Sequence, residues 1–108
     1  MITATQIYAV TRDGLDIILY YYPQAEECVD DKKYKKKFKR RLDEDDASAC
    51  IRKFKECYKV TDFGDTGTAM SPIDICMYEE NLRFPEAIAR LAARYNVTDE
   101  LNRSVNKP

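Results

Sequence analysis

The sequence contains no histidine and only three glycines among its 108 residues. Without histidine, no nucleophile–histidine pair can form, and Gly64 and Gly67 lie too close together to make a phosphate-binding P-loop. No apolar run approaches the ~18 residues of a membrane-spanning helix, and nothing resembles a signal peptide. These absences predict a cytoplasmic protein with no membrane association, no cofactor and no catalytic activity of its own.

Cysteine is present, but not in a metal-binding pattern. Cys28, Cys50, Cys57 and Cys76 are separated by 22, 7 and 19 positions, and no two of them form a C-x-x-C pair. This spacing fits no common zinc signature. We therefore expect reduced, buried thiols.

The net charge of −1 is an average over a strongly segregated sequence. Hydrophobic residues make up 44% of the chain, which favours a single folded domain. Residues 32–59 contain twelve Lys/Arg and five Asp/Glu, a local charge of +7, so the remaining residues sum to −8. A basic centre predicts an anionic partner, of which nucleic acid is the commonest.

The N-terminal part, residues 1–23, has the pattern of a helical lead-in. Apolar residues recur at helical spacing over residues 3–22, with a break at Asp13-Gly14 and an end at Pro23. Thr3 or Thr5 can cap the first piece. Of the tyrosines at positions 20–22, we expect one or two to pack in the core; stacking on bases is the alternative. Residues 24–37 are expected to form a polar loop or the edge of a hairpin.

Residues 38–63 have the pattern of a small antiparallel sheet. Strands are predicted at Phe38–Leu42, Ala47–Phe54 and Cys57–Thr61, with turns at 43–46 and 55–56. One face of this sheet should pack on helices, and the other should be wet and basic.

Two helices are predicted over residues 71–95. Ser71 and Asp74 can cap the first, with Pro72 at its first position, and Pro85 has the same role in the second. Asn96 should end the second helix, and residues 98–108 should form a tail or linker. The predicted fold is α+β, a three-stranded antiparallel sheet packed against N-terminal and C-terminal helices.

The D-F-G-D turn at 62–65 and the helices after it resemble a known family. With the segment D-E-D-D-A-S-A-C-I at 43–51, they resemble the N-terminal zinc-ribbon domain of bacterial-type DNA primases over roughly residues 38–97. The matching helical positions are Met77, Leu82, Phe84, Glu86, Ala87, Leu91 and Ala92. The resemblance implies a primase zinc-ribbon-like domain over 1–97 that holds template while a following domain makes the primer, as in a phage or mobile-element replication protein.

The family's zinc ligands are missing from this sequence. Its Cys-x-x-His and Cys-x-x-Cys positions fall here on Lys39, Leu42, Asp62 and Asp65. Lysine and leucine cannot ligate zinc, and two carboxylates are a poor closed structural site. The resemblance therefore implies a degenerate ribbon without zinc, held together by its apolar core.

The K-K-Y-K-K-K-F-K-R-R run at 32–41 has eight basic residues among ten, interleaved with aromatics. Such a pattern suits the backbone and unpaired bases of single-stranded DNA, although lysines also protect an edge strand from aggregation. The predicted binding residues are Lys32, Lys33, Tyr34, Lys35, Lys36, Lys37, Lys39, Arg41, Arg52, Lys53 and Lys59.

Two other functions fit the same sequence. The basic face can dock an acidic surface of a helicase or polymerase partner. Alternatively, Asp62 and Asp65 can hold a weak divalent ion in a metal-dependent enzyme, although Asp and Gly also favour a plain turn there.

Overall fold

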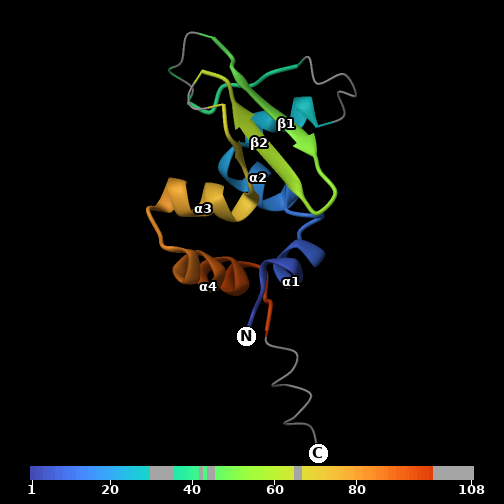
Figure 1. Ribbon diagram of the computed structural model, residues 1–108, viewed down its shortest axis with the longest axis vertical. Coiled ribbons are helices and arrows are strands. Elements are labelled where there is room, and N and C mark those ends of the chain that lie inside the picture. Colours follow the sequence, from blue (N-terminus) through green and yellow to red (C-terminus); the bar gives the residue numbers. More distant parts are fainter. Residues whose placement is uncertain (30–35, 42, 44–45, 65–66, 99–108) are drawn as a thin grey trace, which may run out of the picture.

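The computed structural model describes residues 1–29, 36–41, 43, 46–64 and 67–98, which form three layers. The sheet is the first layer, α2, the 3₁₀ helix η1 and α3 form the second, and α1 and α4 form the third (Figure 1). The helices are α1 (Ala4–Ala9), α2 (Leu15–Tyr21), η1 (Pro23–Cys28), α3 (Pro72–Glu80) and α4 (Phe84–Arg94). The strands are β1 (Ala49–Lys53), β2 (Tyr58–Asp62) and β3 (Ala69–Met70). The predicted α+β class is confirmed.

The predicted N-terminal helix pair is also confirmed. Thr3 caps α1 in a capping box with Gln6, and Arg12, Asp13 and Gly14 all take positive φ before α2 begins. The expected polar loop after Pro23 was wrong in its first part, because residues 23–28 form η1. The cause is a pair of small apolar side chains three positions apart, Ala25 and Cys28, which the three-residue turn of a 3₁₀ helix buries together.

The three consecutive tyrosines lie in three different environments. Tyr22 is buried and its hydroxyl donates to Glu79 Oε2 over 2.5 Å, whereas Tyr20 is exposed. Tyr21 is half-buried and its hydroxyl contacts both Glu80 and, at 3.2 Å, the Cys76 sulfur. Burial and these hydrogen bonds raise the pKa of Tyr21 and of Tyr22 above its ordinary value. The prediction that one or two tyrosines join the core is confirmed.

The sheet is three-stranded and antiparallel, in the order β1-β2-β3, but one strand was predicted in the wrong place. The second and third predicted strands form the β1–β2 hairpin, whereas the predicted strand at Phe38–Leu42 is reduced to a bridge between Phe38 and Ala49. The ladder stops after Phe38 because the carbonyls of Lys39 and Arg40 accept hydrogen bonds from the Gln24 side chain. The third strand is β3, in the link before α3.

Helix α3 begins as predicted, whereas α4 begins one residue earlier than predicted, so that Pro85 is its second residue and not its first. Ser71 and Asp74 form a capping box around Pro72, and the Glu86 carboxylate accepts from the Arg83 N–H at the start of α4. Helix α4 ends at Arg94, and Asn96 follows with a positive φ. Both helices contribute buried residues to the interior, which is divided into two apolar clusters.

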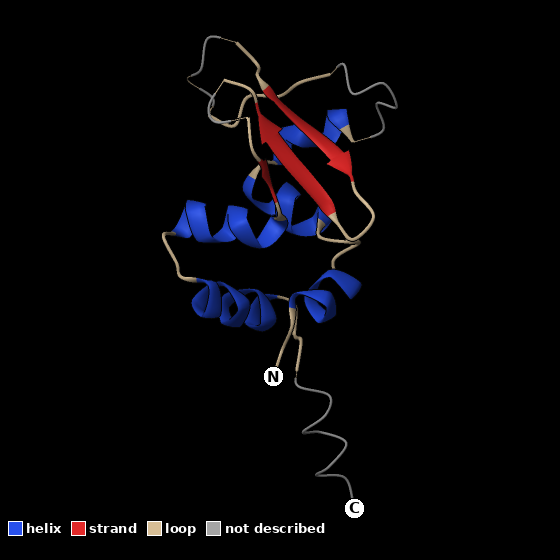
Figure 2. Cartoon of the chain, in the orientation of Figure 1, coloured by secondary structure: helices blue, strands red, loops and turns tan. Residues whose placement is uncertain are grey.

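Each apolar cluster fills one boundary between layers. The first packs the sheet on α2 and η1 and includes Ile51, Val60 and Ile18, with Ile75 from α3. The second packs α1 and α4 against the middle layer. Helix α3 has buried residues in both clusters, so α4 is separated from the sheet by the middle layer (Figure 2).

Gly14 is predicted to be indispensable for the junction of these layers. A Cβ there would lie 2.2 Å from Pro72 Cγ at the start of α3, and φ is +87°. Gly67 has a similar φ of +74° but no atom within 4 Å of its hypothetical Cβ. Gly67→Ala should therefore lower the free energy of unfolding by about 1 kcal/mol, the cost of a left-handed backbone with a Cβ. Gly14→Ala should lower it by at least about 2 kcal/mol more, because the Cβ also clashes with Pro72. Urea unfolding of both variants measures the difference, and equal losses would show that the contact with Pro72 relaxes freely.

Candidate nucleic-acid interface

The register of the β1–β2 hairpin separates an inner from an outer face. Ala49, Ile51, Val60 and Asp62 point inward and are buried. Because side chains alternate along a strand, residues 50, 52 and 54 point outward together with residues 59, 61 and 63, although Cys50 is itself covered and buried. The hairpin lies in front of α2 and η1 in Figure 2, so its outer face is turned toward the viewer.

The exposed part of this outer face combines cations with aromatic rings. Arg52 and Lys59 are direct cross-strand partners. The Lys59 ammonium lies 4.9 Å from the centroid of the Phe54 ring, and the Lys37 ammonium lies 5.5 Å from that of Phe63. Both phenylalanines are exposed, Phe54 at 39% and Phe63 at 54%. We call Lys37, Arg52, Phe54, Lys59 and Phe63 the outer-face cluster.

Phe54 and Phe63 were missed by the sequence reasoning. Each lies one residue beyond a strand, yet the Phe63 N–H still donates to the Ser48 carbonyl and the Phe54 N–H to the Cys57 carbonyl. The hairpin ladder therefore continues to both rings and fixes their side of the sheet. The signal was present in the sequence, because extending the strand alternation by one residue places both rings with Arg52 and Lys59.

The other predicted binding residues are divided among several surfaces. Lys53 lies on the inner side of the hairpin and pairs with Asp13 over 3.1 Å. Arg41 pairs with Glu79 of α3 over 3.0 Å, and Lys39 is half-buried. Lys36 is exposed near Lys37. The expected single patch on the sheet was therefore too broad, and Lys32, Lys33, Tyr34 and Lys35 lie outside the described residues.

A buried ion pair occupies the end of β2, at one of the positions where the resemblance placed a zinc ligand. Arg40 Nε lies 2.8 Å from Asp62 Oδ2, and the two side chains are 7% and 5% exposed. The other carboxylate oxygen accepts from the Ser48 hydroxyl at 2.6 Å and from the Gly64 N–H at 2.9 Å. Burial alone would raise the pKa of Asp62, but these hydrogen bonds and the Arg40 charge lower it. Leu42 and Asp65 lie outside the described residues.

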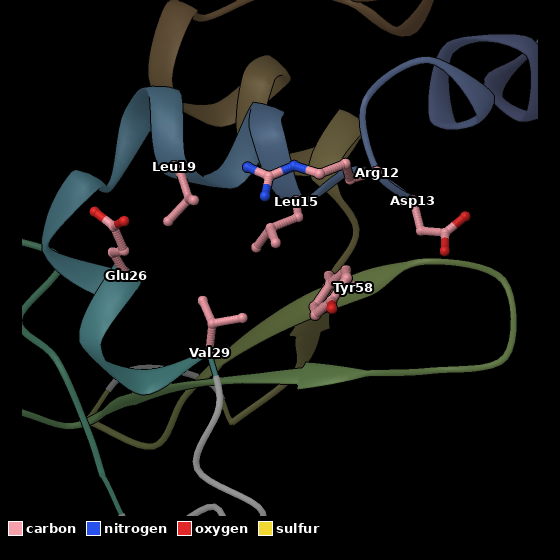
Figure 3. A pocket seen from close by; sticks show the side chains of 7 residues that line it. All are labelled: Arg12, Asp13, Leu15, Leu19, Glu26, Val29 and Tyr58. Carbon is pink, nitrogen blue, oxygen red and sulfur yellow. The ribbon is translucent and has the colours of Figure 1, made fainter.

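Two open hollows flank the sheet. One, of about 490 Å³, lies beside the ion pair and is lined by Arg41 and Tyr78 as well as by Asp46. The other, of about 380 Å³, has Leu15 and Leu19 facing Val29 and Tyr58, with charged side chains of both signs around them (Figure 3). Both hollows mix cations with carboxylates, so neither extends the cationic surface of the outer face.

The predicted weak metal site and the four thiols have other roles in the structure. In the described ranges, no three His, Cys, Asp or Glu side chains come together as a possible metal site. The Asp62 carboxylate is engaged by Arg40, Ser48 and Gly64. All four cysteines are buried thiols outside any disulfide, as predicted. Burial raises the pKa of the Cys57 and Cys76 thiols, which keeps them protonated and unreactive at neutral pH.

No protein-family model, curated protein or solved structure matches the chain. Among the described residues, no helix is both long and apolar enough to cross a membrane.

Asp62→Asn is predicted to be strongly destabilising, since it removes the negative charge that lies 2.8 Å from the buried Arg40 guanidinium. We expect a loss of about 3 kcal/mol in the free energy of unfolding. The matched control is Asp13→Asn, which removes the same charge from the exposed pair with Lys53 and should cost less than about 1 kcal/mol. Denaturant unfolding compares the two, and similar losses would mean that the Arg40–Asp62 pair contributes little.

The same pair predicts a dependence of stability on acid. The folded-state pKa of Asp62 lies below the ordinary 3.8, so its contribution is complete above that pH and is lost as the pH falls through the folded-state value. Wild type and Asp13→Asn should therefore lose stability more steeply than Asp62→Asn below about pH 4. Measuring the free energy of unfolding across this pH range tests the prediction. Parallel curves for all three proteins would show that Asp62 does not cause the loss of stability in acid.

Proposed function

We propose that this chain is a DNA-binding accessory domain of a primase-like replication protein that contacts single-stranded template through the outer face of its sheet. The observation that carries the proposal is the pairing of two exposed phenylalanine rings with lysines on one face. Exposed aromatic rings stack on unpaired bases, while lysine and arginine neutralise phosphates. This combination suits a single strand, whose bases are accessible, better than a duplex.

The arrangement of elements supports the primase-like part of the proposal. The β1–β2 hairpin is followed by the turn after Asp62, by the short strand β3 and then by the helices α3 and α4. A strand, a turn and then two helices is the order that the resemblance implies. At the former ligand position, the Asp62 carboxylate is bound to Arg40, which is compatible with a domain that dispenses with zinc. We propose a cytoplasmic protein in which template binding is the role of this domain and catalysis belongs to another.

The same cations are also compatible with docking on an acidic helicase or polymerase surface. The two functions differ in what the aromatic rings contribute. Phe54 and Phe63 are exposed, each beside a lysine that is exposed (Lys37) or half-buried (Lys59). A flat apolar ring stacks on a base but gains little from a carboxylate. This difference favours binding to nucleic acid over docking on an acidic protein.

Binding to single-stranded oligonucleotides is predicted to weaken steeply with salt and to depend little on sequence. If Lys59 contacts one phosphate, Lys59→Ala should reduce the magnitude of the slope of log K against log salt concentration by about 0.7. Arg83→Ala, an exposed cation at the start of α4, is the control and should leave the slope unchanged. Fluorescence anisotropy at several salt concentrations measures both. Failure to bind any oligonucleotide at low salt would reject the proposal and leave docking on an acidic protein.

A further inference from the structure

The two ring–lysine pairs lie at opposite ends of the outer face and on different strands. Phe63 follows β2 and is bonded across to Ser48, whereas Phe54 follows β1 and is bonded across to Cys57. A line between the rings therefore runs diagonally across the hairpin. The Arg52–Lys59 cross-strand pair lies on this face between the two ends.

The length of this diagonal follows from the strand geometry. Cys57, opposite Phe54, precedes Phe63 by six residues along the same chain segment. At about 3.3 Å per residue, the ends of the path are about 20 Å apart. A stacked nucleic-acid strand rises about 3.4 Å per nucleotide, so it covers this distance with about six nucleotides, and an extended strand needs fewer.

The charges along the path match a continuous backbone. Lys37 lies at the Phe63 end, Arg52 and Lys59 lie along the face, and Lys59 also covers the ring of Phe54. A cation over a ring retains its full charge, so each lysine is able to attract a phosphate while the neighbouring ring meets a base. On the inner side of the hairpin, the Lys53 ammonium also lies over a ring, that of Tyr58 at 5.5 Å, but its charge is offset by the Asp13 carboxylate.

We infer that the outer face binds one strand, with one base on Phe54 and another on Phe63 at the same time, over a site of about six nucleotides. This inference rests on the proposed function and adds the length and path of the ligand. Bases inside a duplex are stacked on each other and paired, so a duplex of the same length cannot engage both rings. The rings make the face selective for single strands, while its cations alone would attract either form.

The test uses oligothymidylates of about three, six and twelve nucleotides with the full chain and its Phe54→Ala and Phe63→Ala variants. Wild-type affinity should rise at least tenfold from the shortest to the middle length and by far less beyond it. With the middle length, each variant should lose at least about fivefold in affinity. With the shortest oligothymidylate, each variant should lose less affinity, because the remaining ring still accepts a base. Phe84→Ala removes an equally exposed ring, 52%, from α4 and should change nothing.

The outcomes separate this inference from the proposed function. Full affinity at the shortest length, or a loss in only one of the two phenylalanine variants, would overturn the two-ring path while leaving single-strand binding intact. No binding at any length would reject the proposed function itself. Because both rings are solvent-exposed, both variants should retain the wild-type unfolding curve, and an unfolding check establishes that affinity changes report on the surface. A duplex should bind more weakly than the single strand and equally to wild type and variants.

Discussion

The buried contact between Arg40 and Asp62 holds together the part of the molecule that carries the site. A buried charge pair is stabilising only when its remaining hydrogen-bonding capacity is satisfied, and Ser48 and Gly64 supply this for the carboxylate. The contact joins the chain just after Phe38 to the end of β2. It thereby fixes the turn that carries Phe63 and the approach of Lys37 to that ring.

Helix α3 connects this region to the rest of the protein through two neighbouring carboxylates. Glu79 accepts from the Tyr22 hydroxyl and pairs with Arg41, next to the buried Arg40. Glu80 contacts Tyr21, Arg90 and Arg94, which links α2 and α4 on the other side of α3. Burial keeps the tyrosine hydroxyls protonated by raising their pKa, so they remain donors to these carboxylates. The three layers are thus joined by polar contacts as well as by the two apolar clusters.

Local signals in the sequence were enough to predict the helices and the hairpin, but not the contacts made over long distances. Ser71, Pro72 and Asp74 identify the start of α3 because a helix cap is formed by neighbours in the chain. The strand at Phe38–Leu42 was wrong because Gln24, distant in sequence, takes the carbonyls that a strand would have used. Arg40 looked like one more surface cation, since nothing near it in sequence indicates a carboxylate 22 positions away.

Contacts between residues distant in sequence also decide which basic residues form a binding surface. Counting lysines and arginines predicted one broad patch, but Arg40, Arg41 and Lys53 each lie against a carboxylate that offsets their charge. These three cations also lie over tyrosine rings. Lys37 and Lys59 lie over phenyl rings, which attract an ammonium group without neutralising it. The cationic character of the outer face therefore depends on what each cation faces more than on how many there are. A ring beneath a lysine leaves the charge available to a phosphate and adds a surface for a base, and for that reason the site follows the two phenylalanines across the hairpin.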